Sequence, residues 1–421
     1  MPGRGGVTPA ARLAAAIELL TAIGREERPA DAVAQAFFRD RRFIGSADRR
    51  AVSAQVWGVL RGWRRLGWWL ARVDLPDTPP LRLATALLLE GWTEAGVTQC
   101  FSGGRYAPAK LAAVDVARLR DLVGHTLDHP EQDLAVRTEL PDFLLAPLEA
   151  RFGPALEAEM RAMLTEAPLD LRVNALKATR EEAIAALAAE GIEASPTPHS
   201  AWGLRVEGRR PVVTGAAFRT GLVEIQDEGS QLIADLVGAA PEMRVADYCA
   251  GAGGKTLAMA MAMRNRGHIV ALDVSAPRLE AAGKRLRRAG VHNVERHLIE
   301  PGDKWAKRRA GGFERVLVDA PCSGTGTWRR NPDARLSLRE TDIEELIVKQ
   351  GEIIQAASAL VKPGGRLIYA TCSLLPRENE GQVAMFLARN EGFRPVGAAL
   401  SLTPRRDGTD GFFAQALERV A

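Results

Sequence analysis

The fold is decided by one stretch, Val245-Ala246-Asp247-Tyr248-Cys249-Ala250-Gly251-Ala252-Gly253-Gly254-Lys255-Thr256. An apolar run typical of a strand ends at Asp247, a glycine-rich turn follows, and helix-forming residues begin at Leu257. Strand, glycine loop and helix in this order form the first βα unit of a nucleotide-binding type of fold, where amides at the helix N-terminus meet a polar ligand. The stretch therefore predicts a loop that binds a ligand.

Two familiar glycine motifs miss this loop by one residue each. A phosphate-binding loop would need a glycine at Cys249, and a dinucleotide-binding loop would need one at Thr256. An adenosine ligand without a polyphosphate, such as S-adenosylmethionine, remains compatible with the spacing. A tight turn that only joins a strand to a helix is the structural alternative.

The composition is that of a globular protein. The chain has 421 residues, of which 46% are hydrophobic and 26% charged, and this length suits two or three domains. No run approaches the ~20 apolar residues of a membrane span, and we expect no secretion signal. The four cysteines show no C-x-x-C spacing, which argues against a disulfide framework or a metal site. We expect a cytoplasmic monomer with free thiols.

Positive charge is concentrated near the start of the chain. The net charge of the whole chain is only +4, yet residues 1–70 hold twelve arginines against six acidic residues. A locally basic domain is one feature of proteins that bind nucleic acid. An ordinary solvated surface explains the charge alone equally well.

The apolar pattern divides the chain into three predicted domains. Residues 1–138 repeat apolar side chains at helical spacing without β alternation, which predicts an all-α domain. Residues 139–225 combine short strands with helices and predict a small α+β module. Residues 226–421 alternate strand and helix, which predicts a Rossmann-like, doubly wound α/β domain.

Reactive side chains follow the predicted strands of this last domain. Strands are expected at His268–Asp273, Arg315–Asp319 and Arg366–Ala370, with a sharp turn at Pro363–Gly365. Ligands of open α/β sheets bind outside the carboxyl ends of the strands. We therefore expect a single rim that carries Cys249, Cys322, Cys372, Asp273 and Asp319.

Three strings on this rim resemble the motifs of a known family. DYCAGAGGKT (Asp247–Thr256), VDAPCSGTG (Val318–Gly326) and ATCSLLPRENE (Ala370–Glu380) look like the signature motifs of the Sun-domain family of RNA cytosine-5 methyltransferases. Gln226–Gln231 resembles the lead-in motif of that family, and Leu171–Asn174 resembles part of its preceding small module. The helical N-terminal part resembles the NusB-like RNA-binding domain of the bacterial ribosomal members.

The resemblance implies covalent catalysis by two cysteines. Carbon 5 of cytosine is too weak a nucleophile to accept a methyl group, and attack of a thiolate at carbon 6 activates it. The family pattern assigns this attack to Cys372 and assistance in the release of the product to Cys322. Asp319 is expected to hold the base, and Lys255 is expected either to support a thiolate or to form a structural salt bridge.

The resemblance also implies a site for S-adenosylmethionine. Its methionine part is expected to contact Cys249, Ala250, Gly251, Ala252, Gly253, Gly254 and Lys255. Asp273 is expected at the ribose hydroxyls with Arg278 supporting its carboxylate, and Asp319 is expected to contact the cofactor as well as the base. The adenine contact is expected at Asp303, with Glu300 as the alternative.

The expected partner is RNA, and the NusB-like part favours small-subunit ribosomal RNA. A paired cytosine cannot reach a thiolate, so the target base must be flipped out or single-stranded. Arg329, Arg330 and Arg335 follow Cys322 closely and are expected to contact RNA phosphates. A tRNA cytosine-5 methyltransferase and a catalytically inactive RNA-binding ribosome assembly factor are the alternatives.

Overall fold

The structure, a computed structural model, describes residues 8–208 and 210–420, and the chain divides into two compact units. The first unit contains Met1–Thr165 and Trp328–Leu338, and the second contains Glu166–Thr327 and Arg339–Ala421. The domain boundary predicted after residue 138 therefore lies inside the first unit.

Side chains of the helical domain hold the segment that follows the predicted boundary. Arg137 forms an ion pair with Glu157 at 3.1 Å, and Arg64 forms one with Asp142 at 2.7 Å. These pairs join residues on both sides of position 138, so the helices that follow it cluster with the first unit.

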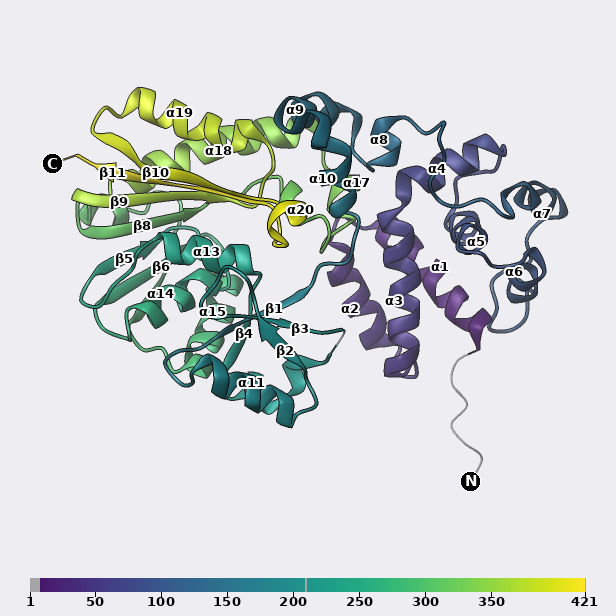
Figure 1. Cartoon of the computed structure of the whole chain (residues 1–421), viewed down its shortest axis with the longest axis horizontal. Helices are drawn as coiled ribbons and strands as arrows, with labels where there is room; N and C mark the ends of the chain where they lie inside the picture. The colour runs from purple at the N-terminus through teal and green to yellow at the C-terminus, as the bar shows by residue number, and fades with distance from the viewer. Residues whose placement is uncertain (1–7, 209, 421) are drawn as a thin grey trace. The chain divides into compact units, whose positions relative to one another are not determined.

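The first unit is helical. Its elements are α1 (Pro9–Arg25), α2 (Ala30–Asp40), α3 (Ser46–Arg61), α4 (Trp63–Arg72), α5 (Pro79–Leu89), α6 (Glu94–Cys100), α7 (Ala113–Leu119), η1 (Arg120–Leu122), α8 (Leu134–Arg137), α9 (Asp142–Phe152), η2 (Gly153–Ala155), α10 (Leu156–Ala162) and α17 (Ala334–Ser337) (Figure 1). Leu13, Leu60 and Trp69 lie in its apolar core, and the Trp69 indole donates a hydrogen bond to the carbonyl of Leu127. No described helix of the chain is long and apolar enough to cross a membrane.

The segment Trp328–Leu338 is part of this helical unit although it follows Cys322 closely in the chain. Asp333 accepts a hydrogen bond from the amide of Ala30 at 2.8 Å and so caps the start of α2. Arg329 and Arg335 are 4% and 3% exposed, and burial lowers the pKa of Arg335 to about 10. Buried guanidinium groups cannot contact RNA phosphates, so the prediction is wrong for Arg329 and Arg335. Arg330 is only partly buried, and its phosphate contact stays a prediction.

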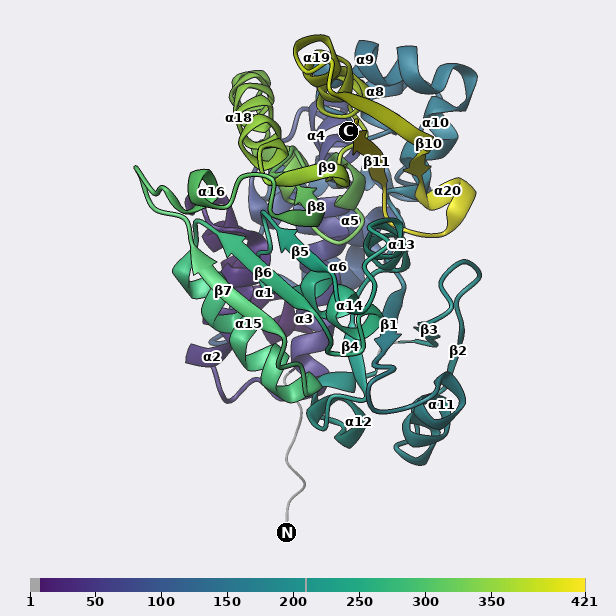
Figure 2. The same cartoon turned by 90° about the vertical axis from the view of Figure 1, so that its left-hand side faces the viewer.

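The second unit begins with a four-stranded sheet in the order β2-β3-β1-β4. Its elements are β1 (Leu169–Val173), α11 (Arg180–Ala189), β2 (Ala194–Pro196), β3 (Gly203–Val206), η3 (Val212–Thr214), α12 (Ala216–Arg219) and β4 (Val223–Ile225). All pairings in this sheet are antiparallel. Leu187 of α11 and Ala217 of α12 pack with Leu171 and Val223 of the sheet in one apolar cluster. Figure 2 shows α11 and α12 beside the strands of this sheet. This arrangement agrees with the predicted α+β module.

The larger sheet has seven strands in the order β10-β11-β9-β8-β5-β6-β7. They are β5 (Arg244–Asp247), β6 (His268–Asp273), β7 (Val294–Leu298), β8 (Phe313–Asp319), β9 (Val361–Thr371), β10 (Phe393–Leu402) and β11 (Phe412–Arg419). The five strands from β9 to β7 are parallel, and the β11 and β10 pairings are antiparallel. The predicted Rossmann-like fold is confirmed, and β6 has the predicted bounds.

Helices cover both faces of this sheet. They are α13 (Glu228–Leu236), α14 (Gly254–Ala262), α15 (Ala276–Ala289), α16 (Trp305–Arg308), η4 (Thr325–Thr327), α18 (Glu340–Ser358), η5 (Pro376–Glu378), α19 (Glu380–Arg389) and α20 (Pro404–Asp407). Figure 1 shows α18 and α19 on one face and α13 and α14 on the other. Ile354 of α18 packs on Val316, and Met259 of α14 packs on Val245 in a separate core cluster. The carboxyl ends of the parallel strands lie between these two helix layers and form the predicted rim.

One predicted turn lies inside a strand. Pro363–Gly365 was expected to be a sharp turn, but β9 continues from Val361 to Thr371. Phe313 pairs with Val361 while Arg315 pairs with Arg366, so β9 accommodates three extra residues in a bulge. Beyond the bulge, β9 pairs regularly with β8 from Arg366 to Ala370, where the strands reach the rim.

Candidate active site

The glycine loop between β5 and α14 is shaped by its backbone. Gly251 and Gly253 have φ values of +54° and +78°, a region that favours glycine. The amide of Ala250 donates to the carbonyl of Leu272 at 2.9 Å and ties the loop to β6. A Cβ atom on Gly253 would lie 3.0 Å from the Cβ of Ala282, so a side chain here would require its neighbour to move by a few tenths of an ångström. The loop conformation therefore favours glycine at this position.

Asp273 ends β6 beside this loop and is buried. Its carboxylate accepts hydrogen bonds from the amides of Gly251 and Ser275, each at 2.8 Å. Arg278 is exposed and makes no ion pair with Asp273 within the described part of the chain. Backbone amides hold the carboxylate in this structure, and the predicted place of Arg278 in the cofactor site stays a prediction.

Asp247 ends β5 and is almost fully buried at 1% exposure. One carboxylate oxygen accepts a hydrogen bond from the Thr256 hydroxyl at 2.6 Å, and the other, Oδ1, has no hydrogen-bond partner among the described residues. Burial raises the pKa of Asp247 to about 7. Because this oxygen is buried and no described residue pairs with it, Asp247 favours its protonated form below about pH 7.

Lys255, on the first turn of α14, faces Asp319 at the end of β8. Lys255 Nζ and Asp319 Oδ2 are 2.6 Å apart. Burial alone would lower the pKa of Lys255, but the charge of Asp319, the hydrogen bond to it and other nearby negative charges together outweigh burial, and the pKa lies above its usual value. The charge of Cys372 acts in the same direction. Lys255 is thus a cation shared by the predicted cofactor loop and the predicted nucleophile.

Cys322 and Cys372 come together as predicted. Their Sγ atoms are 3.4 Å apart, although the two residues follow different strands, β8 and β9. The hydrogen bond to Cys372, burial, and the charges of Cys372 and Glu378 raise the pKa of Cys322 well above its usual range. The pair therefore holds one thiol firmly protonated beside the other.

Cys249 shares the rim but has a different environment. Burial, together with the nearby Asp319, Asp247 and Asp273, raises the pKa of Cys249 well above its usual range. A thiol with a raised pKa and acidic neighbours is a poor nucleophile. Cys249 therefore fits the wall of a ligand site and does not fit attack on a substrate.

The predicted adenine contact lies in the segment after β7. Asp303 accepts a hydrogen bond from the amide of Trp305 at 2.8 Å and lies 2.6 Å from Nε2 of His297. The His297 contact and the amide lower the pKa of Asp303, which is therefore an ionised acceptor. Burial, Cys249 and Asp303 together raise the pKa of Tyr248, which relates this segment to the glycine loop. Glu300 is exposed, and the choice between the two acids remains a prediction.

Several residues near the rim were not predicted from the sequence. Glu378 is fully buried and accepts hydrogen bonds beside both cysteines, and Gln350 of α18 donates to it and to the carbonyl of Pro321. Arg172 of β1 donates to the carbonyl of Gly254 at 2.9 Å and so ties the small sheet to the cofactor loop. Glu378 was inside a recognised string, but nothing in that string distinguishes it from the exposed Glu380.

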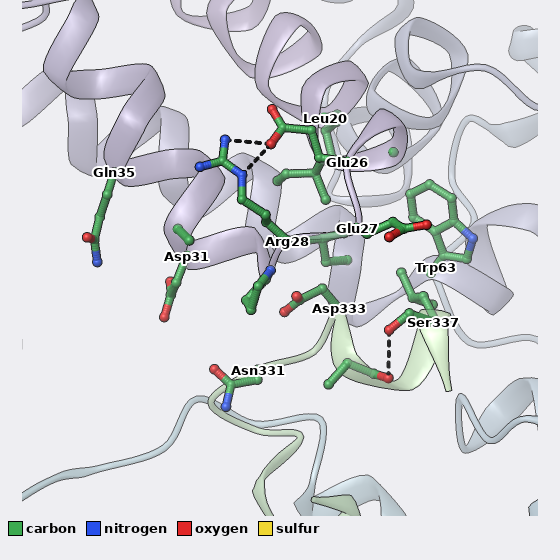
Figure 3. A pocket seen from close by; sticks show the side chains of 17 residues that line it. Leu20, Glu26, Glu27, Arg28, Asp31, Gln35, Trp63, Asn331, Asp333 and Ser337 are labelled. Atoms are coloured by element: carbon green, nitrogen blue, oxygen red, sulfur yellow. Dashed lines mark hydrogen bonds and ion pairs between the residues drawn. The ribbon is translucent and has the colours of Figure 1, made fainter. Parts of the chain in front are cut away.

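The helical unit contains a separate cavity of about 750 Å³. Figure 3 shows Asp31 and Asp333 at this cavity, with Trp63 farther along its wall and Arg28 paired with Glu26. Burial and the charge of Asp333 raise the pKa of Asp31. None of the predicted catalytic residues lines the cavity, so its size does not identify the reaction site.

Comparisons with known proteins identify the family to which this chain belongs. Residues 236–418 match the family described as 16S rRNA methyltransferase RsmB/F, and residues 140–213 match the ferredoxin-like domain described for RsmF/B-like methyltransferases. A ribosomal RNA small subunit methyltransferase B of Xanthomonas campestris is 33% identical over 389 residues, which cover 87% of this chain and 88% of that protein. This chain belongs to the RsmB/F methyltransferase family. Its cofactor is S-adenosylmethionine.

Other RsmB/F relatives and solved structures extend the match. A Pseudomonas putida protein with the same description is 36% identical over 301 residues, 69% of each chain. A crystal structure described as PH0851 has 25% identity and a TM-score of 0.81, and the match covers 99% of this chain and all of that one. A methyltransferase homolog from Pyrococcus horikoshii has 26% identity and a TM-score of 0.62 over 70% of this chain. The likeness therefore includes the helical unit and does not end with the Rossmann-like domain.

Proposed function

We propose that this protein methylates carbon 5 of a cytosine in small-subunit ribosomal RNA, using S-adenosylmethionine as the methyl donor. The observation that carries the proposal is the pair of thiols, Cys322 and Cys372, with Sγ atoms 3.4 Å apart at the ends of neighbouring strands. A methyltransferase that acts on an oxygen or an amine does not need two thiols, whereas carbon 5 must first be activated by covalent attack. The relatives named for small-subunit ribosomal RNA support that substrate.

The rim fits the implied cofactor. Asp273 keeps lone pairs for ribose hydroxyls, because each of its oxygens accepts only one backbone amide. Gly251 has a positive φ, and a Cβ there would meet no atom within 4 Å, so the loop leaves open space on that side. When bound, S-adenosylmethionine supplies an electrophilic methyl group.

Cys372 carries out the attack in this proposal. Its Sγ bonds to carbon 6 of the cytosine, and the electrons of the double bond between carbons 5 and 6 become available at carbon 5, which takes the methyl group. Asp319, held at 2.6 Å by Lys255, is positioned to accept a hydrogen bond from the exocyclic amine of the base. Lys255 also places a positive charge near Cys372.

Cys322 acts at the release step. The proton on carbon 5 must leave, the double bond must re-form, and the Cys372 sulfur must depart as a thiolate. The pKa of Cys322 is raised by its hydrogen bond to Cys372 and by burial, and the Cys372 charge adds to them. Because bonding of Cys372 to the base removes that charge and that hydrogen bond, the proposal makes Cys322 a stronger acid, and so a readier thiolate base, at this stage.

A methylation assay on the full-length protein tests this function. Total RNA is incubated with labelled S-adenosylmethionine and the modified position is located by bisulfite sequencing. We expect 5-methylcytosine in small-subunit ribosomal RNA. Label in tRNA alone would reject the substrate, and label at a base nitrogen or at ribose oxygen would reject the two-thiol chemistry.

A further inference from the structure

Glu378 lies next to the cysteine pair without contacting either sulfur by a hydrogen bond. It ends η5 and has no exposed surface. One carboxylate oxygen, Oε1, accepts hydrogen bonds from the amide of Ser323 at 2.8 Å and from the side chain of Gln350 at 2.9 Å. The other, Oε2, accepts from the hydroxyls of Ser323 and Ser373, each at 2.5 Å. All four acceptor positions of the carboxylate are therefore in use.

These hydrogen bonds reach both cysteine loops. Ser323 directly follows Cys322, and Ser373 directly follows Cys372. A single buried carboxylate thus joins the residues that flank the two thiols. Gln350 extends the tie to the residue before Cys322, because its amide also donates to the carbonyl of Pro321 at 2.9 Å.

The charge of Glu378 has no direct cationic partner in the residues that the structure describes. Burying an ionised carboxylate without an ion pair is costly, and hydrogen bonds offset only part of that cost. A neutral glutamine at position 378 could keep the same contacts, since its oxygen can accept two donors and its amine can donate to a serine hydroxyl. The contacts alone therefore do not require a charged group at this position.

We infer that Glu378 is a positioning residue of the reaction, whose buried carboxylate clamps the loops of Cys322 and Cys372 together and keeps the two sulfurs in contact. The inference rests on the proposed two-cysteine function. The negative charge of Glu378 also contributes to the raised pKa of Cys322. Glu378 therefore sets the spacing of the thiols and helps to keep Cys322 protonated.

Disulfide trapping tests the spacing in the absence of RNA. Diamide accepts two hydrogen atoms from two nearby thiols and leaves a disulfide, so the rate of Cys322–Cys372 disulfide formation measures how often the sulfurs meet. We expect Glu378→Gln to form the bond at a rate within about two-fold of the unmodified protein. Glu378→Ala, which lacks the clamp, should form it at least about ten-fold more slowly.

Glu380→Ala is the matched control, since Glu380 is an exposed acid two residues away in the same motif. Its trapping rate should equal that of the unmodified protein. Near-ultraviolet circular dichroism separates a folded Glu378→Ala from an unfolded one, and Glu378→Asp, shorter by one methylene, gives a milder version of the same change. Trapping at the unmodified rate in folded Glu378→Ala or Glu378→Asp would overturn the clamp.

The pH dependence of alkylation tests the charge. In a Cys372→Ser background, iodoacetamide modifies Cys322 as its thiolate, and mass spectrometry of the peptide gives the rate. Glu378→Gln should speed this reaction at pH 8 by about three-fold or more, whereas Glu380→Gln should not change it. Equal rates for all three proteins would overturn the assigned role of the charge.

These tests are independent of the proposed reaction. If RNA is not methylated but trapping and alkylation behave as expected, the proposed function fails and the clamp stands. If RNA is methylated and the kcat of Glu378→Ala equals that of the unmodified protein, the clamp fails and the function stands. We expect kcat to fall at least about ten-fold in Glu378→Ala, with KM for S-adenosylmethionine unchanged.

Discussion

The glycine loop and the cysteine pair lie on one rim but are held in different ways. The loop is shaped by its own backbone, through the positive φ values of Gly251 and Gly253 and the hydrogen bond from Ala250 to β6. The cysteine pair is held from outside, by Glu378 of η5 and Gln350 of α18. A site made of backbone is encoded in a short string, whereas a site held by side chains depends on residues that meet only in the folded protein.

The difference predicts different costs of mutation. Changes in the loop act through backbone strain of one or two kcal/mol, since a non-glycine residue at positive φ costs about that much. Changes at the cysteine pair remove a reacting group, and loss of a nucleophile lowers turnover by several orders of magnitude. The predictions below test this ranking.

The largest effect is expected at Cys372. Cys372→Ala should lower methyl transfer at least about 10³-fold, because no other thiol on the rim can attack carbon 6. Cys322→Ala should allow attack but block release, and a denaturing gel should then show a covalent RNA–protein adduct. Cys100→Ala, in the helical unit, serves as the control and should leave turnover within about two-fold. An adduct in Cys372→Ala and none in Cys322→Ala would reverse the two roles.

A smaller effect is expected at the cation that links the two regions. Lys255→Met should lower kcat/KM by about 10²-fold, or roughly 2.7 kcal/mol, because Asp319 loses its partner and the thiolate of Cys372 loses a nearby positive charge. Lys362 forms an ion pair of the same 2.6 Å length with Glu314, but it is 43% exposed.

Lys362→Met is therefore the matched control for Lys255→Met. Exposed pairs contribute at most about 1 kcal/mol to stability, so this variant should keep its kcat/KM. Steady-state kinetics with saturating RNA would measure both. Equal losses in the two variants would mean that the length of the ion pair, and not its place on the rim, decides the effect.

The same difference explains how much could be predicted from the sequence. The strand, the glycine turn and the helix of the loop are consecutive, and local patterns were sufficient to find them. Cys322 and Cys372 could also be brought together from sequence, because parallel strands end at one edge of a sheet and the motif strings follow two of them. The order of the strands and the reactive residues at their ends could thus be predicted from the sequence alone.

The contacts of the residues around the site could not be predicted from the sequence in the same way. Arg329 and Arg335 were expected to contact RNA because they follow Cys322 closely in the chain, but Trp328–Leu338 belongs to the helical unit and both arginines are buried. Arg278 was expected at Asp273, but the turn itself supplies two amides to that carboxylate. In each case a contact distant in sequence, or a backbone group, replaced the side chain that a motif would suggest.

Asp247, at the end of β5 beneath the glycine loop, gives a prediction about how stability depends on pH. Its pKa of about 7 in the folded protein exceeds the usual value of 3.8, so between these values the native state holds a proton that the unfolded chain has released. This contribution to stability is complete below about pH 4 and is lost as the pH rises through about 7. Asp247→Asn cannot ionise and should not show that loss.

Urea unfolding of both proteins at pH 5 and pH 8 measures this effect. Relative to the unmodified protein, Asp247→Asn should gain roughly 2 to 3 kcal/mol of stability between pH 5 and pH 8, the part of the pKa change from 3.8 to about 7 that falls in this range. Asp40→Asn, at an exposed position, should show no such gain. Parallel curves for Asp247→Asn and the unmodified protein would mean that Asp247 is not protonated in the native state near neutral pH.

The smallest effect is expected in the loop itself. Gly253→Ala combines a φ of +78° with a contact of 3.0 Å between the new Cβ and Ala282, so we expect a loss of about 2 kcal/mol in stability and about ten-fold weaker binding of S-adenosylmethionine. Gly364→Ala is the matched control, because its φ is +72° and its Cβ would meet no atom within 4 Å. It should cost about 1 kcal/mol of stability and leave cofactor affinity unchanged, as measured by isothermal titration calorimetry. Equal affinities in both variants would show that the loop can shift to accept a side chain, and the loop would then be shaped by its ligand as well as by its backbone.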